Sequence, residues 1–369
     1  MATEDEASDG SSSGSDMELD CRVFDLHSRR GRAARRRLPE PFCAWARAPG
    51  PGGRSLGAEA AKKLAGLARG VFAEAANESF WVAAGASPRS PLERFALDVF
   101  WFHAARLGWT ATSVARLGRA AGAEYWVQRR TAPGSSARRS INWHFDKDEA
   151  LLDAADLTVH PLVATVTYLS DHGAPLVALP QPTLDASPDG TELRPLKPTE
   201  TIDAYMVFPA RACHVAFRGN SLHGCPAQLE RSRGERLSLL VNVWLHHRPM
   251  GLRGWPSRVP SQRCVAERHP RRLQIGRRLR IKEVKLDDES TRSTANFEIS
   301  CGPWQLHGLR LPSSDAAVGG ANVLAVRQAP GEPSVVAPRS KARCRAKKPV
   351  RKRPAGLRGT PIATRRRQA

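Results

Sequence analysis

The chain has 369 residues, enough for one large domain or two ordinary ones. Hydrophobic residues make up 41% of it and glycine adds 29 residues, so the composition excludes a chain that is disordered throughout. No apolar stretch approaches the roughly 18 residues of a membrane span, and the acidic first twenty residues do not resemble a secretory signal. Seven scattered cysteines without a Cys-x-x-Cys pair favour a reducing compartment. We therefore expect an intracellular protein with no membrane segment.

The formal net charge of +21 is spread unevenly along the chain. Residues 1–20 carry −7 and residues 339–369 carry +13, which leaves +15 for residues 21–338. A basic surface attracts polyanions such as nucleic acid or acidic proteins. However, only 10 of the 57 basic residues are Lys, and this Arg bias is also what a GC-rich genome produces. Both explanations of the basic middle stay open at this point.

The two ends of the sequence have little that could be buried. Residues 1–20 predict an acidic disordered tail, and residues 330–369 predict a basic disordered tail. Residues 21–56 are rich in Arg, Pro and Gly and predict a mostly irregular linker with one short helix near Phe42–Ala48. The basic cluster at 341–353 is typical of a nuclear-import signal or a nucleic-acid-binding arm, with a merely solvated tail as the alternative. Localisation is therefore expected to be nuclear if the cluster is a signal, and cytoplasmic otherwise.

Residues 57–250 have the composition of a globular domain, and the hydrophobic period within them changes from 3.6 to 2. Two helices are expected first, the second after a Ser-Pro start at 90–91. Their apolar faces are Leu64, Leu67, Val71, Phe72 and Ala75 for the first, and Leu92, Phe95, Val99 and Phe102 for the second.

Short β-rich runs separated by turn residues follow these helices, which indicates a sandwich or a barrel. The segment 251–329 is expected to be a C-terminal extension, in which Val284, Leu286, Phe297 and Ile299 could add a hairpin or two to the sheet. The expected strands are 124–129, 141–145, 159–169, 175–179, 204–208, 213–217 and 236–244.

The most informative motif is Trp143-His144-Phe145-Asp146, at the end of an expected strand. In an extended chain residues i and i+2 face the same side, so His144 and Asp146 can reach one metal ion. His223, just before a Gly-Cys-Pro turn, is the expected third ligand. Two imidazoles and one carboxylate form the facial triad of non-haem Fe(II) oxygenases, which leaves three coordination positions open.

Three other interpretations compete with this one. His144 and Asp146 could form a structural hydrogen-bonded pair, and His214 could replace His223 as the third ligand. A tetrahedral zinc site would combine His214 and His223 with Cys213 and Cys225, although their separations are not the short paired spacings of zinc folds.

A further motif begins thirteen residues after His223, where Arg236 starts an alternating apolar strand. Arg236 and Ser238 are expected to share one face of it. A guanidinium and a hydroxyl inside a sheet require an anion, and a carboxylate that binds the guanidinium through both oxygens satisfies this need well.

Five stretches in order resemble the Fe(II)- and 2-oxoglutarate-dependent dioxygenases of the prolyl-hydroxylase-like branch. The resemblance covers about residues 120–247 and implies a mostly β protein with a double-stranded β-helix, or jelly-roll, core and flanking N-terminal helices. It implies His144, Asp146 and His223 as catalytic iron ligands, with Arg236 on the distal carboxylate of 2-oxoglutarate and Tyr168 and Ser238 assisting. The stretches are WHFDKDE at 143–149, YLSDHGAPLVALP at 168–180, YMVFPA at 205–210, SLHGCP at 221–226 and RLSLLVNVW at 236–244.

The resemblance implies that Fe(II), 2-oxoglutarate and O2 are used to hydroxylate, or oxidatively demethylate, a substrate, with release of succinate and CO2. We expect a protein side chain as substrate ahead of nucleic acid, and nucleic acid ahead of a small molecule, because tails and a basic surface suit macromolecular partners. The alternative is a non-catalytic jelly-roll scaffold that binds nucleic acid through its basic arms.

Overall fold

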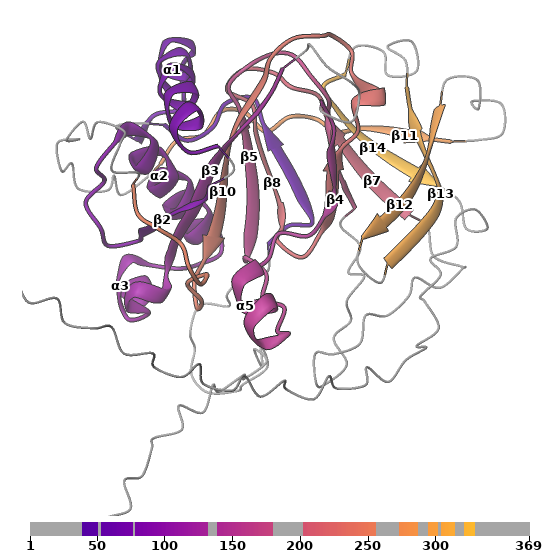
Figure 1. Ribbon diagram of the computed structural model, residues 1–369. Coiled ribbons are helices and arrows are strands. Elements are labelled where there is room, and N and C mark those ends of the chain that lie inside the picture. The colour runs from indigo at the N-terminus through magenta and orange to yellow at the C-terminus, as the bar shows by residue number, and fades with distance from the viewer. Residues whose placement is uncertain are drawn as a thin grey trace, which may run out of the picture.

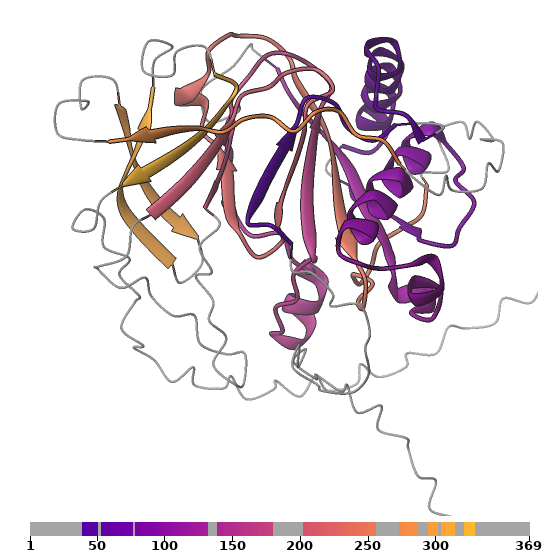
Figure 2. The same cartoon turned by 180° about the vertical axis from the view of Figure 1, so that it is seen from behind.

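Two six-stranded sheets lie face to face in the computed structural model of the chain. Helices cover the outer face of the first sheet, and a two-stranded hairpin covers the outer face of the second (Figures 1 and 2). The structure describes residues 39–50, 53–76, 78–131, 139–179, 202–255, 273–286, 294–301, 304–313 and 321–328.

The first sheet is antiparallel throughout, and its strand order shows that the sequence crosses repeatedly between sheets. The nine-residue strand β10 pairs with β3, which is equally long, over its full length and with β5 on its other side. In sheet order the strands are β1 (Phe42–Trp45), β8 (His214–Arg218), β5 (Val163–Tyr168), β10 (Arg236–Trp244), β3 (Gly122–Arg130) and β2 (Phe80–Ala83).

The second sheet is antiparallel except at its edge, where β11 runs parallel to β14. Two facing antiparallel sheets of this kind form the double-stranded β-helix expected from the sequence. In sheet order the strands are β11 (Lys282–Lys285), β14 (Val323–Gln328), β7 (Ile202–Val207), β6 (Leu176–Leu179), β9 (Leu222–Cys225) and β4 (Ile141–His144).

The helices lie against the first sheet because β10 turns one wholly apolar face toward them. Its odd-numbered residues from Leu237 to Val243 pack in the same core as α1 and α2, which contact β3 and β10. Ser90 caps α2 by accepting a hydrogen bond from the Glu93 backbone N–H, and Pro91 occupies the first turn. The helices are α1 (Ala58–Glu74), α2 (Pro91–Arg106), α3 (Ala111–Ala115) and α5 (Glu149–Ala155), with 3-10 turns at Gly118–Ala120 and Ala227–Leu229.

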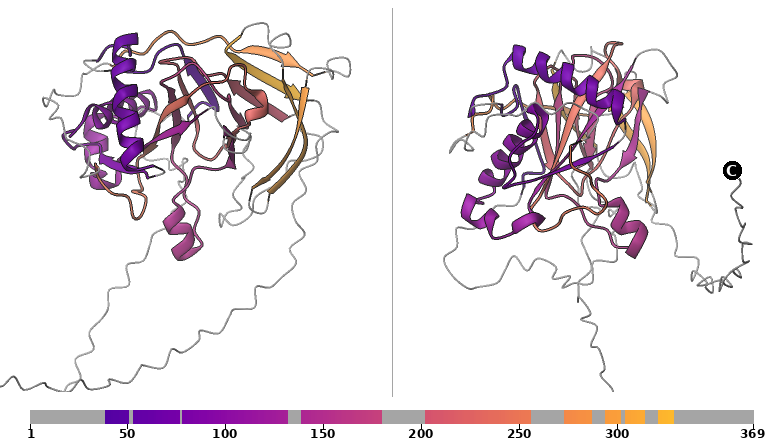
Figure 3. Two further views of the ribbon diagram at one scale, coloured as in Figure 1. Left: turned by 45° about the horizontal axis from the view of Figure 1, so that its top comes forward. Right: turned by 60° about the vertical axis from the view of Figure 1, so that its left-hand side comes forward.

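A second core fills the space between the two sheets. Alternate residues of the first sheet, such as Val166, Val215 and Leu240, meet Leu176 and Val207 of the second. Figure 3 shows from two further directions that the sheets enclose this interior, with the helices on one flank. The polar residues expected at the functional site lie within this otherwise apolar layer.

The hairpin of β12 (Thr294–Cys301) and β13 (Trp304–Pro312) forms a small sheet of its own. Phe297, Ile299, Leu309 and Leu311 pack against the outer face of the second sheet. The expectation of added hairpins in 251–329 is therefore met in part by β12–β13, while β11 and β14 extend the second sheet separately.

All seven expected strands are present, with ends that differ by up to four residues, and both expected helices are present as α1 and α2. The short helix expected near Phe42–Ala48 is wrong, because Phe42–Trp45 is strand β1 and pairs with β8. β2 and β9, each of four residues, were not expected.

The tails at 1–20 and 330–369 lie outside the described residues, as does the basic cluster at 341–353. The division of the chain into domains at 56–57 and 250–251 stays a prediction. No helix in the described ranges is long and apolar enough to cross a membrane.

Replacing Leu239 by Ala tests the packing of the helices on the first sheet. Leu239 is completely buried in the core shared with α1 and α2, so the change should lower the free energy of unfolding by about 2–5 kcal/mol. Leu157→Ala is the control, because Leu157 is 38% exposed and its loss should cost less than about 0.5 kcal/mol. Urea unfolding measures both, and equal effects would contradict the assigned packing.

Candidate metal centre

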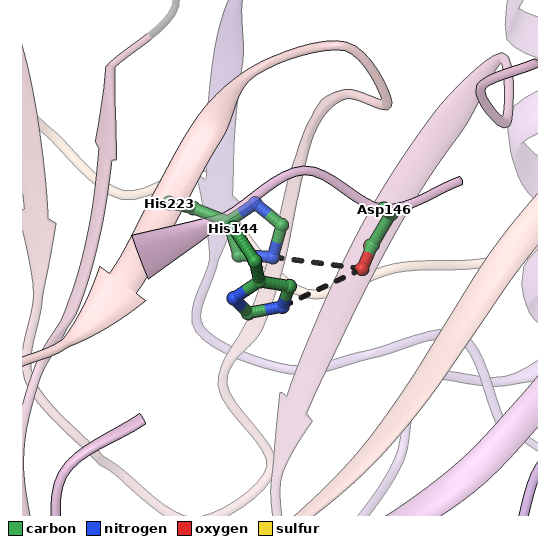
Figure 4. Close-up of side chains that lie close together, drawn as sticks. All are labelled: His144, Asp146 and His223. Atoms are coloured by element: carbon green, nitrogen blue, oxygen red, sulfur yellow. Dashed lines mark ion pairs between the residues drawn. The ribbon is translucent and has the colours of Figure 1, made fainter. Parts of the chain in front are cut away.

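Three side chains from separate positions in the fold converge between the sheets. His144 ends β4 and His223 lies on β9, and the antiparallel pairing places these two residues directly opposite each other. Asp146 follows β4 by two residues and turns its carboxylate toward both rings (Figure 4). The centroids of the two imidazole rings are 4.2 Å apart.

The distances suit a shared cation. The Nε2 atoms of His144 and His223 each lie 3.7 Å from Asp146 Oδ1. One ligand atom from each of the three residues lies within 4.8 Å of the others, a spacing that could hold a metal ion. Within the described residues, no other group of three or more His, Cys, Asp or Glu side chains meets this condition.

Backbone contacts determine which ring nitrogens can bind a metal. His144 Nδ1 lies 2.7 Å from the Asn142 carbonyl oxygen, and His223 Nδ1 lies 3.0 Å from the Ser221 carbonyl oxygen. A carbonyl oxygen only accepts, so each Nδ1 carries the proton and donates it. Each Nε2 therefore presents a lone pair toward Asp146, which is the tautomer that metal-binding histidines use.

Because this cluster is buried, its carboxylate and imidazole nitrogens need a cation to balance them. His223 and Asp146 are buried, whereas the side chain of His144 is 40% exposed. Burial, followed by the neighbouring His144, lowers the pKa of His223 to about 4, so its ring is neutral near pH 7. Two nitrogen lone pairs and a carboxylate then face one another, and a divalent cation fits this donor set.

The loop that carries Asp146 is held from two sides. Asp148 caps α5 by accepting from the Leu151 N–H at 3.0 Å, and its other oxygen contacts His247 Nε2 at 2.7 Å and the Met250 N–H at 2.9 Å. His160 Nδ1 donates to the Asp146 carbonyl oxygen at 2.7 Å. These contacts restrict where the Asp146 carboxylate can point.

Arg236 lies on the inner face of the first sheet, across the layer from the sheet that carries His144 and His223, and is fully buried. Its Nε donates to the Ala174 carbonyl oxygen at 3.0 Å, and its other nitrogens contact Gln128 Oε1 at 2.9 Å and Cys225 Sγ at 3.2 Å. No Asp or Glu of the described ranges pairs with it. A buried guanidinium surrounded by neutral partners is a strong site for a carboxylate.

Ser238 and Tyr168, which are cross-strand neighbours, border this guanidinium. Ser238 Oγ is buried and has no hydrogen-bond partner among the described residues. The Tyr168 hydroxyl donates to the Val207 carbonyl oxygen at 3.0 Å and accepts from the Leu176 N–H at 3.2 Å, while its ring centroid lies 5.3 Å from the Arg236 guanidinium. Ser238 therefore has free bonding capacity, whereas the hydroxyl of Tyr168 is already engaged by backbone.

Three residues of β3 that line the same face were not singled out in the sequence. Arg130 lies directly opposite Arg236, and Gln128 lies opposite Ser238. Burial and the neighbouring Arg236 charge lower the pKa of Arg130, so two guanidiniums share this end of the layer. Glu124 lies further along the strand. The even spacing of these side chains was visible, but the register that places them opposite β10 was not.

His214 does not belong to the cluster, although it was a competing third ligand. Its Nε2 lies 3.0 Å from His103 Nε2 and its Nδ1 lies 2.8 Å from Thr167 Oγ1, on the helix-covered side of the first sheet. Burial lowers the pKa of His214 to about 3 and also lowers that of His103. The zinc alternative, which needs His214 and His223 together with Cys213 and Cys225, is not assembled either.

No family model and no curated protein matches the sequence. Solved structures do match. A prolyl-4-hydroxylase from Pseudomonas putida is 17% identical, with a TM-score of 0.30, over 58% of this chain and 96% of that one. HygX from Streptomyces hygroscopicus, solved with nickel and 2-oxoglutarate bound, is 15% identical, with a TM-score of 0.31, over 58% of this chain and 85% of that one.

The carbocyclase SnoK of nogalamycin biosynthesis, described as non-heme and alpha-ketoglutarate-dependent, is 12% identical, with a TM-score of 0.32. That match covers 66% of this chain and 96% of the other. At such low identities and TM-scores the function has to be argued from the side chains of this chain.

Removing either imidazole should abolish tight metal binding. We expect the protein to bind one Mn(II) or Fe(II) per chain. Losing a residue that only hydrogen-bonds to a metal ligand typically weakens metal binding by about 10–100-fold, so His144→Ala or His223→Ala, which removes a ligand itself, should weaken it by more. His172→Ala is the matched control, because His172 is exposed and lies outside the cluster. Calorimetric titration with Mn(II) measures the affinities, and full binding by His223→Ala would contradict the assignment.

The buried pair of His103 and His214 should make folding sensitive to acid. Both pKa values are lowered in the folded chain, so the unfolded chain binds more protons below the ordinary value of 6.5. The free energy of unfolding should therefore fall as the pH drops below about 6.5. His103→Gln removes one such group and should reduce the loss between pH 7 and 5.5 by about 1 kcal/mol. Urea unfolding at both pH values checks this, and an unchanged loss would contradict it.

Proposed function

We propose that the chain is an Fe(II)- and 2-oxoglutarate-dependent dioxygenase that hydroxylates its substrate. The observation that carries the proposal is the combination of two features that face the same layer between the two sheets. His144, Asp146 and His223 offer two imidazole nitrogens and one carboxylate to a cation. Arg236, buried without an acidic partner in the described ranges, and Ser238, with an unpaired hydroxyl, offer donors to an anion.

The donor set favours iron among the common metals. Two imidazoles and one carboxylate on a single face leave the opposite positions open, as in non-haem Fe(II) oxygenases. Iron held there would supply, with 2-oxoglutarate and O2, the oxidising chemistry that yields succinate and CO2.

The residues of the chain would bind and orient the reactants. His144, Asp146 and His223 hold the metal, and the backbone contacts of both imidazoles keep each Nε2 directed at it. Arg236 binds the far carboxylate of 2-oxoglutarate, and the Ser238 hydroxyl donates a further hydrogen bond to it. Val166, Leu240 and other apolar side chains of the inter-sheet core exclude water from this end of the layer.

The substrate is proposed to be a protein side chain, ahead of nucleic acid and of a small molecule, because the chain is strongly basic and a macromolecular partner suits it. The second candidate function is a non-catalytic scaffold that binds nucleic acid through its basic arms. These arms lie outside the described residues, whereas the convergence of His144, Asp146 and His223 and the burial of Arg236 support the enzyme. Fe(II)-dependent release of succinate from 2-oxoglutarate, with and without candidate substrates, separates the two.

Substituting Arg236 tests the 2-oxoglutarate assignment. Arg236→Ala should weaken 2-oxoglutarate binding by about 3–5 kcal/mol, because it leaves the far carboxylate unpaired, and should spare Mn(II) binding. Arg236→Lys should restore only part of the affinity, since an ammonium cannot form the planar two-point contact. Calorimetric titration of the Mn(II)-loaded protein measures both effects.

Arg233→Ala is the matched control, because Arg233 is exposed and three residues away on the same segment. It should bind 2-oxoglutarate as the unaltered protein does. Undiminished affinity in Arg236→Ala would move the 2-oxoglutarate site elsewhere.

A further inference from the structure

Six residues beyond Arg236 on β10, the same inner face carries hydrogen-bond acceptors in place of donors. Asn242 lies directly opposite Glu124 of β3, and both share the face of Arg236 and Ser238. At about 3.3 Å per residue, Asn242 is about 20 Å along the strand from Arg236. Donors therefore gather at one end of the face, and acceptors gather at the other.

The acceptors at this end are incompletely satisfied. Glu124 Oε2 accepts from Trp244 Nε1 at 3.0 Å and from Asn242 Nδ2 at 3.3 Å. The carbonyl oxygen of the same amide, Asn242 Oδ1, is buried and has no hydrogen-bond partner among the described residues. Asn242 is 2% exposed, so water does not readily satisfy this atom.

The carboxyl group of Glu124 at this end also lacks a cationic partner. Burial, followed by the nearby Asp146 carboxylate, raises the pKa of Glu124 to about 7. Within the described ranges, no Lys, Arg or His forms an ion pair with Glu124. A metal bound by Asp146 would balance that carboxylate, but the hydrogen-bond donors to Glu124, from Trp244, Asn242 and Ser79, are all neutral.

An aromatic side chain lies beside these acceptors. Trp126 is half-buried and follows Glu124 by two residues on β3, so it shares the inner face, opposite Leu240 of β10. An indole face attracts cations, and carboxylate and carbonyl oxygens accept hydrogen bonds from them. The three groups together favour a ligand that carries both positive charge and N–H donors.

We propose that Glu124 and Asn242, flanked by Trp126, recognise a cationic nitrogen of the substrate, an alkylammonium or a guanidinium group. This inference rests on the proposed function, because it assigns the substrate class of that same site. The ring of His223 contacts that of Phe217, and Phe217 is level with Asn242 across β5, so the recognised group lies toward the metal ligands. A substrate bound there would present carbon atoms close to its own charged nitrogen for hydroxylation.

The test uses small probes that report on their distance from the metal. The protein is loaded with Mn(II) and 2-oxoglutarate, and the relaxation of probe protons by the paramagnetic ion is measured by NMR. The probes are n-butylammonium, n-propylguanidinium and the neutral n-butanol. We expect saturable relaxation by at least one cation, with an affinity about tenfold or more above that of butanol, as a charge-assisted hydrogen bond provides. The stronger of the two cations identifies the nitrogen group.

Substitutions separate the proposed contact from general attraction. Glu124→Gln and Asn242→Leu should each weaken the preferred cation by about tenfold and leave butanol unchanged. Glu59→Gln, the same chemical change at an exposed position in the first turn of α1, should alter nothing. Unfolding midpoints identify a variant that fails to fold, and the preference of the unaltered protein for cations over butanol does not depend on any variant.

Two results would overturn the inference while the proposed function stands. Either butanol binds as tightly as both cations, or folded Glu124→Gln keeps the full affinity for the preferred cation, in protein that binds Mn(II) and 2-oxoglutarate normally. Failure of the unaltered protein to bind Mn(II) or 2-oxoglutarate, measured beforehand by calorimetry, would instead overturn the proposed function, and with it the substrate assignment.

Discussion

The pairing of β4 with β9 is the constraint on which the candidate site depends. It sets His144 directly against His223, so two imidazoles enter the layer between the sheets side by side. A shift of one residue in this register would turn one ring to the opposite face of the sheet. The hydrogen bonds from each Nδ1 to a carbonyl two residues earlier then direct both Nε2 atoms at Asp146. The candidate metal centre is therefore a consequence of strand register and local backbone contacts together.

The first sheet is stabilised by apolar packing on one face and carries buried polar side chains on the other. The odd-numbered residues of β10 pack with α1 and α2 in an apolar core that needs no polar partners. The even-numbered residues include Arg236, Ser238 and Asn242, whose burial is costly unless something bonds to them. A sheet stabilised through one face can keep unsatisfied polar atoms on the other. Ser238 Oγ and Asn242 Oδ1 are two such atoms, and both lie on the inner face.

Much of this arrangement was predictable because the relevant signals are local. Strand β10 shows alternating polarity over nine residues, and its ends agree with the sequence prediction. His144 and Asp146 are two residues apart, so an extended backbone alone brings them together. His223 lies on a different strand, so its place beside them could be predicted only from the resemblance to a known motif. β9 itself has four residues, which is too short for a periodic signal.

What could not be predicted depends on contacts between distant segments. β1 precedes its partner β8 by about 170 residues, and its Phe-Cys-Ala-Trp sequence is apolar without a period that separates strand from helix. Glu124 was visible as a member of the strand expected at 124–129, whereas Arg130 lies one residue beyond its expected end. Their places opposite Arg236 and Asn242, however, follow only from the pairing of β3 with β10. The role of such side chains cannot be predicted until the pairing register of their strand is known.

The order of groups along β10 also has a consequence for how two reactants would share the interior. Arg236 with Arg130 makes one end positive, and Glu124 with Asn242 makes the other end rich in acceptors. The ring of His223 lies 4.9 Å from that of Phe217, and Phe217 is level with Asn242 across β5, so the metal ligands lie toward the acceptor end. A dicarboxylate anchored at Arg236 would therefore extend from the positive end toward the metal. The acceptor end is left for the other reactant, and an anion placed there would face both Glu124 and Asp146. Charge alone therefore disfavours binding the dicarboxylate at the acceptor end and the other reactant at the positive end.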